Sequence, residues 1–362
     1  MQLLSLTLVN FRNYEEAHFD FSPSLNEFYG DNAQGKSNLL EAIHLLITGR
    51  SFRGANLSHM IRWGSKGFAL KAAFLKHGVA QSLEITYDGA QRHILHNATP
   101  YTSFAHLLGE LRGVLFHPLD STLVTGPPTT RRRFIDLHLS TINPLYLAHL
   151  SRYTKAMQQR NATLKSRELS GIESWEHEMA LSAAYLTRTR VAFMAEIQPQ
   201  VTAIATLLSQ GIDTLTLSFR SNLPLPQDIA SAPLEELYRT GYSRTRNRDL
   251  LLCHTSLGPH RDDFNLHLCN RELRLYGSEG QIRCASMSLR LTEWHHLHSL
   301  SGAPPLKLID DIGAHLDPKR KAQLHETLAT SGQAFLTAPE PLTLYPSVTT
   351  SRRFAIESGR VF

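Results

Sequence analysis

The stretch "GDNAQGKSNLL", residues 30–40, has the spacing G-x-x-x-x-G-K-[ST] of a phosphate-binding loop, or P-loop. In such a loop, backbone N–H groups and the lysine hold phosphates, and the hydroxyl that follows reaches Mg²⁺. Lys36 and Ser37 are the lysine and the hydroxyl of this match, and Ser37 is therefore a candidate metal ligand. The complete candidate phosphate site consists of Gly30, Asp31, Asn32, Ala33, Gln34, Gly35, Lys36, Ser37 and Asn38. The spacing alone proves little, so the neighbouring sequence must decide whether this stretch is a phosphate-binding loop.

The residues around this stretch predict a strand before it and a helix after it. "AHFDFSPSLNEFYG", residues 17–30, reads as a strand that runs directly into the loop. Apolar residues from Leu39 to Ile47 recur at helical spacing, and Gly49 stands where a helix C-terminal glycine is expected. A strand, loop and helix in this order aim the helix N-terminus at an anion. The alternative, a plain turn between strand and helix, leaves Lys36 without a role.

The rest of the chain predicts an α/β protein with a helical middle. Residues 68–75 and 81–89 resemble a β-hairpin, and residues 111–120, "LRGVLFHPLD", contain another short strand. Helical patterns dominate between residues 143 and 211, after which strand character returns at "DTLTLSF", residues 213–219. We expect three parts: residues 1–115 and 241–362 as two portions of one head, and residues 116–240 as a mainly helical arm.

A second motif, "PPLKLIDDIGAHLD", residues 304–317, supplies carboxylates after an apolar strand. A P-loop fold holds Mg²⁺ through a carboxylate at the end of such a strand, and Asp310 is the candidate. Asp311 would then lie next to the γ-phosphate, where a carboxylate can orient or deprotonate the attacking water. The alternative reading is a buried strand followed by a capped turn.

A third motif, "YGSEGQIRCASMSLRLTEW", residues 276–294, places Ser278, Gly280 and Gln281 before an amphipathic helix. Serine and glycine at a helix N-terminus form an anion-binding end. One P-loop needs only one anion-binding site of this kind. A second one has a function if it binds the nucleotide held by another subunit, which gives a dimer with ATP at its interface. A simple helix N-cap is the alternative.

Composition limits the class of protein. The chain has 362 residues, a formal net charge of +5 and three cysteines, which are widely spaced and form no C-x-x-C motif. This argues against a disulfide framework and a zinc site, and a reducing cytoplasm fits best. We find no stretch of about 18 uninterrupted apolar residues and expect no membrane association. His295 and His298 stand at i, i+3, but without a third ligand they read as a solvated helix face.

The three motifs in this order resemble the ABC-type ATPase head shared by the SMC and Rad50 proteins. Over nearly its whole length the chain resembles the RecF family of bacterial DNA replication and repair proteins. The resemblance rests on the segments "LTLVNFRNY", "GDNAQGKSNLLEAI", "GRSFRG", "LVTGPPTTRRRFIDLHLS", "YTKAMQQRN", "GPHRDDF", "SEGQIR" and "LIDDIGAHLD".

This resemblance implies a DNA-binding ATPase of recombinational repair with a compact head and a helical arm. It would act at gaps or stalled forks, on single- and double-stranded DNA, and together with RecR and RecO promote RecA loading. ATP and Mg²⁺ would be its cofactors, an ATP-dependent homodimer its active form, and slow, DNA-stimulated hydrolysis its reset. Carried over by position, Lys36 and Ser37 bind phosphates and Mg²⁺, Asp310 binds the metal and Asp311 is the catalytic carboxylate. Ser278, Gly280 and Gln281 reach the partner's γ-phosphate, Asp317 belongs to the loop that crosses the interface, and Arg12 approaches the nucleotide.

Three departures from the family pattern leave alternatives open. Ala33 stands where a glycine is usual, and a positive φ there would cost about 1 kcal/mol. Ala314 and His315 replace the usual Ser-Glu before Leu316-Asp317, and "HPLD", residues 117–120, lacks the acidic residue that commonly follows its proline. These departures keep a DNA-binding scaffold with a decayed ATPase as a rival interpretation. A cassette ATPase of another system is a second rival, against which the helical arm and the RecF-like segments speak. The basic run Arg131–Arg133 and the helical residues Lys155, Arg160, Lys165 and Arg167 are candidate DNA contacts or ordinary helix charges.

Overall fold

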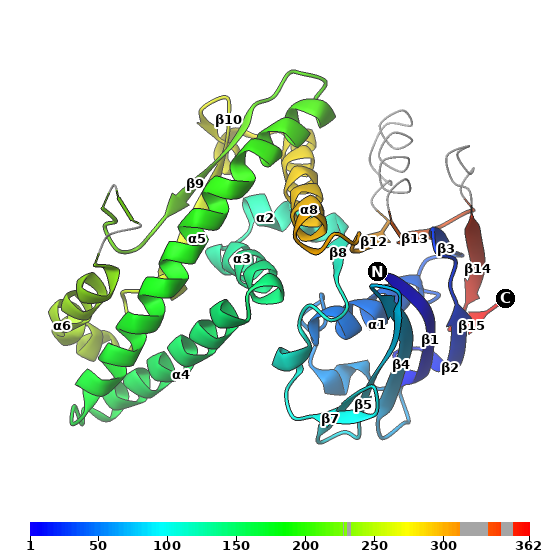
Figure 1. Ribbon diagram of the computed structural model, residues 1–362, viewed down its shortest axis with the longest axis horizontal. Helices are drawn as coiled ribbons and strands as arrows, with labels where there is room; N and C mark the ends of the chain where they lie inside the picture. Colours follow the sequence, from blue (N-terminus) through cyan, green and yellow to red (C-terminus); the bar gives the residue numbers. More distant parts are fainter. Residues whose placement is uncertain (227, 230–232, 312–331, 342–349) are drawn as a thin grey trace. The chain divides into compact units, whose positions relative to one another are not determined.

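A computed structural model describes residues 1–226, 228–229, 233–311, 332–341 and 350–362. The chain divides into two compact units (Figure 1). The first comprises Met1–Leu119 and Glu293–Phe362, and the second is Asp120–Thr292. Residues 241–292, which the sequence analysis grouped with the head, therefore lie in the second unit, together with the helices. The expected α/β class is confirmed.

The described residues of the first unit form two six-stranded sheets. One is antiparallel with the order β2-β1-β4-β5-β6-β7, and the other is mostly parallel with the order β15-β14-β3-β13-β12-β8. The strands of the first sheet are β1 Gln2–Phe11, β2 Tyr14–Asp20, β4 Phe68–Lys76, β5 Val79–Tyr87, β6 Arg92–His96 and β7 Thr99–Tyr101. Those of the second are β3 Leu25–Tyr29, β8 Gly113–Phe116, β12 Leu306–Asp310, β13 Ala334–Ala338, β14 Ser351–Glu357 and β15 Arg360–Val361.

The sequence predictions for this unit hold with one correction. The hairpin of β4 and β5 and the short strand β8 form where expected. Residues 17–30, however, are not one strand, because Asp20 ends β2 and Leu25 begins β3. The intervening "FSPS" breaks the extended run, and the two strands join different sheets.

Helix α1 (Lys36–Thr48) and an aromatic cluster form the core of the first unit. The helix contacts β4 of one sheet and β8, β12 and β13 of the other, and its apolar residues are buried. Gly49 ends the helix in the left-handed conformation with φ 70°, as expected for a C-terminal glycine. The cluster joins strands of both sheets through Phe19, Phe21, Phe28, Phe335 and Phe354. Both halves of this discontinuous unit thus share one core.

The second unit is mainly helical, with a small sheet. Its three-stranded sheet has the order β11-β10-β9. Short 3₁₀ turns apart, its elements are α2 Thr122–Thr125, α3 Pro128–Ile142, α4 Pro144–Ser166, α5 Ile172–Leu208, β9 Leu215–Arg220, α6 Leu234–Leu252, β10 Asp263–Leu268, β11 Arg271–Glu272 and α7 Leu273–Tyr276. Helix α8 (Glu279–Ser301) begins in this unit and continues past its boundary. The long helices predicted between residues 143 and 211 are confirmed as α4 and α5.

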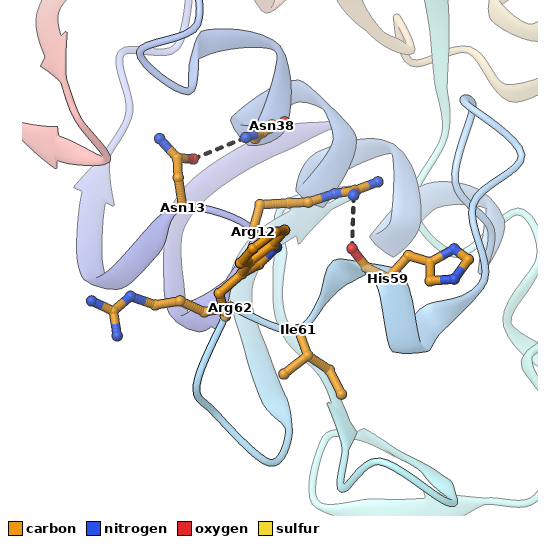
Figure 2. A pocket seen from close by; sticks show the side chains of 7 residues that line it. Arg12, Asn13, Asn38, His59, Ile61 and Arg62 are labelled. Carbon is orange, nitrogen blue, oxygen red and sulfur yellow. Dashed lines mark hydrogen bonds between the residues drawn. The ribbon is translucent and has the colours of Figure 1, made fainter.

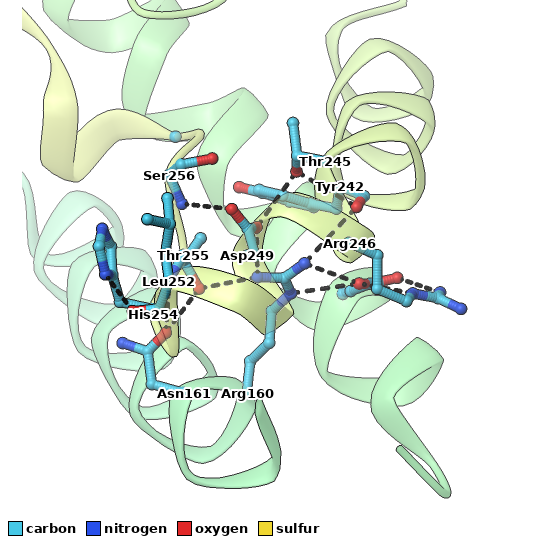
Figure 3. A network of polar contacts seen from close by, with 12 residues as sticks. Arg160, Asn161, Tyr242, Thr245, Arg246, Asp249, Leu252, His254, Thr255 and Ser256 are labelled. Carbon is cyan, nitrogen blue, oxygen red and sulfur yellow. Dashed lines mark hydrogen bonds and ion pairs between the residues drawn. The ribbon is translucent and has the colours of Figure 1, made fainter. Parts of the chain in front are cut away.

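A buried ion-pair network connects three helices of the second unit (Figure 3). Arg160 of α4 is fully buried and contacts Glu176 of α5 at 3.0 Å and Asp249 of α6 at 2.8 Å. The same guanidinium donates to the hydroxyl of Thr255 at 2.9 Å. Burying an arginine requires such partners, because an unpaired charge would lose several kcal/mol of hydration. Arg160 is therefore a structural residue and not a candidate DNA contact.

Helix α5 is, within the described part of the chain, the one helix long and apolar enough by composition to cross a membrane. Several of its apolar residues, among them Met179, Leu186 and Val201, are completely buried in the core of the second unit. It also packs against α4, α6 and β9. These contacts are those of a core helix.

Candidate nucleotide site

The predicted loop lies between β3 and α1 and has an unusual backbone. Gly30, Ala33 and Gly35 have φ values of 142°, 67° and 120°. A Cβ atom at Gly30 would lie 2.4 Å from the carbonyl oxygen of Ile356, and one at Gly35 would lie 2.6 Å from the Asn13 side chain. Gly30 is therefore required by sterics as well as by φ, whereas Gly35 is required by its φ and a Cβ there would also displace the Asn13 side chain. Ala33 meets the condition stated from sequence, a positive φ at a residue that carries a Cβ.

Lys36 begins α1 and curls back over the loop. Its ammonium donates to the carbonyl oxygen of Asp31 at 2.8 Å and to that of Gly30. Burial lowers the pKa of Lys36, and the nearby carboxylates of Asp311, Asp31 and Asp310 oppose this effect. The lysine thus places a positive charge inside the loop, where an anion can replace the carbonyl oxygens as its partner.

Ser37 and Asp310 meet although they lie 273 residues apart in the sequence. The Ser37 hydroxyl donates to Oδ1 of Asp310 at 2.7 Å, and the Thr337 hydroxyl donates to the same oxygen at 2.9 Å. Asp310 ends β12, which is buried throughout, and its own side chain is nearly buried. The two predicted metal ligands are therefore brought together by the parallel sheet.

Asp311 follows directly and has a positive φ of 46°. Its backbone N–H donates to the Thr337 hydroxyl at 3.0 Å, which fixes the turn at the end of β12. The residue is exposed. Its negative charge opposes the lowering of the Lys36 pKa by burial.

The side-chain amides of Asn13, Gln34 and Asn38 form hydrogen bonds that support the loop. The Asn13 side chain donates to the backbone carbonyl of Gln34 at 2.7 Å and accepts from the Asn38 amide at 2.9 Å. The Gln34 side-chain oxygen accepts from the backbone N–H of Ser358 at 2.6 Å. These hydrogen bonds connect the loop to the β1–β2 turn and to the turn after β14, and they hold the loop in this conformation.

A pocket of about 470 Å³ opens beside the start of α1 (Figure 2). It is lined by Arg12, Asn13, Asn38, His59, Ile61, Arg62 and Trp63. Arg12 donates to both oxygens of the buried Glu41 at 2.9 Å and to the carbonyl oxygen of His59 at 2.7 Å. Its guanidinium thus holds the segment that contains His59 against α1. Trp63, with 95% of its surface exposed, presents an aromatic face at the rim.

The third predicted motif lies in the second unit. The Ser278 hydroxyl accepts from the backbone N–H of Gln281 at 3.3 Å, and the Gln281 side-chain oxygen accepts from the N–H of Ser278 at 3.1 Å. This reciprocal pair is a capping box at the N-terminus of α8, and it corresponds to the N-cap alternative. Ser278 and Gly280 are exposed. Asp317, with Ala314 and His315, lies outside the described residues.

The residues present fit a nucleotide with a magnesium ion. The strained loop, its lysine and the first amides of α1 suit phosphate oxygens. Ser37 and Asp310 offer only oxygen donors, which is the ligand chemistry that Mg²⁺ prefers, with the remaining positions left to phosphates and water.

A strand–loop–helix with a lysine, a serine and a paired carboxylate at the end of a parallel strand defines a P-loop ATPase head of the ABC type. In agreement, the family model described as "AAA domain" matches residues 5–112. SMC head domains solved from Pyrococcus furiosus and Pyrococcus yayanosii share this fold, with TM-scores of 0.54 and 0.56 at 16% and 14% identity.

The chain belongs to the RecF family of DNA replication and repair proteins. It is 41% identical over 342 residues to the RecF of Protochlamydia amoebophila, covering 94% of this chain and 95% of that protein. It is 32% identical to the RecF of Enterococcus faecalis, covering 100% and 98%. A RecF structure described as RecF-ATP in the RecFOR pathway matches with a TM-score of 0.93 at 27% identity, covering 100% of this chain and 97% of that one.

Sequence reasoning missed two groups at this site. His117 follows β8, and its Nε2 lies 3.4 Å from Oδ2 of Asp310. Thr337 ends up on the other side of the same carboxylate. Both residues stand at the carboxyl ends of parallel strands next to β12, the edge where ligands bind in α/β sheets. That rule, applied to "LRGVLFHP", could have pointed to His117.

Proposed function

We propose that this chain is a DNA-binding ATPase of recombinational repair whose ATP-bound form is a homodimer closed on DNA at gaps or stalled forks. It cooperates with RecR and RecO in RecA loading in the cytoplasm, and slow, DNA-stimulated hydrolysis resets it. Binding energy drives the closure, and hydrolysis ends it. The observation that carries this proposal is the contact between Ser37 and Asp310, because it joins the P-loop to the carboxylate strand in one preformed site.

Four candidate site residues of the first unit have distinct roles in this proposal. Mg²⁺ with ATP supplies the phosphoanhydride to be cleaved and neutralises the charge on its phosphates. Lys36 and the loop amides bind the phosphates, while Ser37 and Asp310 hold the metal. Asp311 orients the attacking water and accepts its proton. Asp310 is held by neighbouring hydroxyls, whereas Asp311 is exposed, and this difference suits a metal ligand beside a base.

The pocket beside α1 is the proposed nucleoside subsite. Asn38 lines it and follows Ser37 directly in α1, so the pocket continues from the phosphate loop. Its volume of about 470 Å³ suits a nucleoside, and Trp63 with Arg62 offers a flat face for a purine base. Arg12 shapes this pocket through Glu41 and His59 and approaches the nucleotide from β1.

The third motif acts between subunits in this proposal. Ser278, Gly280 and Gln281 would exchange their capping contacts for the γ-phosphate of the partner's nucleotide, with Asp317 at the interface. Ser278 and Gly280 are exposed at the first turn of α8, where a helix end can bind an anion.

Sedimentation with gapped DNA tests the proposal. The protein is run without nucleotide and with ADP, ATP or a non-hydrolysable ATP analogue. We expect a DNA-bound dimer with ATP or the analogue only, and loss of this complex in Lys36→Arg. Lys71→Arg, an exposed position on β4, is the matched control and should behave as the parent chain does. A monomer that binds DNA equally under all conditions, in both variants, would instead support the scaffold with a decayed ATPase.

A further inference from the structure

Contacts with Leu119, Phe52 and Asp310, all within the described part of the first unit, orient the ring of His117. Its Nδ1 accepts a hydrogen bond from the backbone N–H of Leu119 at 3.0 Å. Its ring packs against Phe52 with the centroids 5.1 Å apart. The side chain is 17% exposed, and its Nε2 lies 3.4 Å from Oδ2 of Asp310.

These contacts select a tautomer. A neutral imidazole carries one proton, and a nitrogen that accepts a hydrogen bond cannot be the one that carries it. Because Nδ1 accepts from Leu119, the proton of the neutral ring is on Nε2, the atom that faces Asp310. Since β8 and β12 are parallel neighbours, with Phe116 paired with Ile309, this placement follows from the sheet register.

We propose that His117 is a positioning residue of the nucleotide site, a role that rests on the function proposed above. The Nε2–H of His117 restrains Oδ2 of Asp310, so that Oδ1 stays turned to Ser37, the other proposed metal ligand. When the oxygen that does not bind the metal is already held by a neighbour, the carboxylate has to reorient less on metal binding. His117 thereby tunes metal affinity without touching the phosphates.

Two substitutions separate this role from simple packing. His117→Gln keeps an N–H donor at about the reach of Nε2, whereas His117→Asn keeps only groups at about the reach of Nδ1. Both lose the ring that packs on Phe52. A structural role would therefore be damaged in both variants, and a positioning role in His117→Asn alone.

The experiment titrates Mg²⁺ at a fixed concentration of a fluorescent ATP analogue and follows binding of the analogue by its fluorescence. We expect His117→Asn to need about tenfold more Mg²⁺ for half-maximal binding, the size typical of an outer-shell substitution. His117→Gln should stay within about twofold of the parent chain, and binding in EDTA should be equal in all three proteins. Equal Mg²⁺ dependence in His117→Asn and the parent chain, or equal losses in both variants, would overturn the proposal.

Two results keep this inference apart from the function on which it rests. If the parent chain fails to bind the analogue at any Mg²⁺ concentration, the proposed function fails and the role of His117 fails with it. A second measurement does not depend on the stability of His117→Asn: the imidazole nitrogen signals of ¹⁵N-histidine-labelled parent chain, assigned by the signal lost in His117→Gln. A proton on Nε2 supports the proposal, and a neutral ring with its proton on Nδ1 contradicts it.

Discussion

The guanidinium of Arg12 donates to both oxygens of Glu41, and the Glu41 side chain is completely buried. The pair joins the turn after β1 to the middle of α1. Through its third contact, to the carbonyl oxygen of His59, Arg12 also fixes one wall of the pocket beside the phosphate loop. One arginine therefore links loop position, helix position and pocket shape.

Replacing Arg12 with methionine should be costly, because it leaves the charge of Glu41 buried. Arg53 is the next cation, at 3.6 Å, and is partly exposed. We expect the free energy of unfolding to fall by about 3 kcal/mol, the size seen when one partner of a buried pair is removed. Urea denaturation of Arg12→Met measures this loss.

The double variant Arg12→Met with Glu41→Leu distinguishes pairing from packing. Removing both charges should restore much of the lost stability, since well-packed apolar pairs replace buried ion pairs at little cost. Nucleotide affinity should remain reduced, because the bond to the His59 carbonyl is not restored. A double variant no more stable than Arg12→Met would show that the buried charge is not the source of the loss.

Ala33→Gly should stabilise the loop. Ala33 has φ 67°, a region in which a Cβ costs about 1 kcal/mol and a glycine does not. We expect tighter binding of a fluorescent ATP analogue, by up to about fivefold, if the strain increases in the bound loop, and a small rise in melting temperature in either case. Ala90→Gly, at an exposed hairpin turn with no positive φ, is the matched control. Weaker binding and a lower melting temperature in Ala33→Gly would contradict this account.

Local patterns predicted the loop, α1 with its Gly49 cap and the strand that ends at Asp310, because each depends on neighbours in sequence. The pairing of Ser37 with Asp310 followed from the general logic of P-loop folds. The partners of Arg12 did not follow, since Glu41 looks like an ordinary charge in an amphipathic helix and only tertiary packing buries it.

Basic residues show the same limit. Arg131 and Arg160 read as possible phosphate contacts, yet Arg131 pairs with Asp263 at 2.7 Å and Arg160 with Asp249 at 2.8 Å, both buried. Lys165, in the last turn of α4, is exposed. Net charge and residue type do not distinguish these environments, because burial is decided by residues far away in sequence.

This difference predicts how variants bind DNA. The affinity for DNA, log K, falls as log salt rises. If Lys165 contacts one duplex phosphate, Lys165→Met should make this negative slope shallower by about 0.9. Arg160→Met should leave that slope unchanged while lowering stability, since the buried Asp249 loses its arginine partner, whereas Glu176 keeps Arg246 at 2.5 Å. Binding is measured by anisotropy of labelled gapped DNA at several salt concentrations, below the melting transition of each protein. A reduced slope in Arg160→Met would mean that this network reaches the DNA.

Lys307 on β12 gives a prediction about pH. Its side chain is buried, its ammonium lies 4.4 Å from the centre of the Trp294 ring, and burial lowers its pKa to about 7. Burial lowers the pKa of the neighbouring His295, and the charge of Lys307 lowers it further. In the unfolded chain the pKa of this lysine is near 10.5. Between about pH 7 and 10.5 the unfolded state therefore binds more protons than the folded state, and stability rises with pH.

Lys307→Met should remove this slope. The parent chain should gain up to about 1.4 kcal/mol of unfolding free energy per pH unit above pH 7 from this lysine, and the variant should lack that gain. The advantage of the variant should therefore be largest at and below pH 7, where the folded lysine must carry its charge in a buried position, and should shrink as pH rises. Urea midpoints followed by tryptophan fluorescence at several pH values measure the effect, with Lys71→Met on β4 as the exposed control. Parallel pH profiles for the parent chain and Lys307→Met would mean that the lysine keeps an ordinary pKa, because its charge is stabilised within the fold.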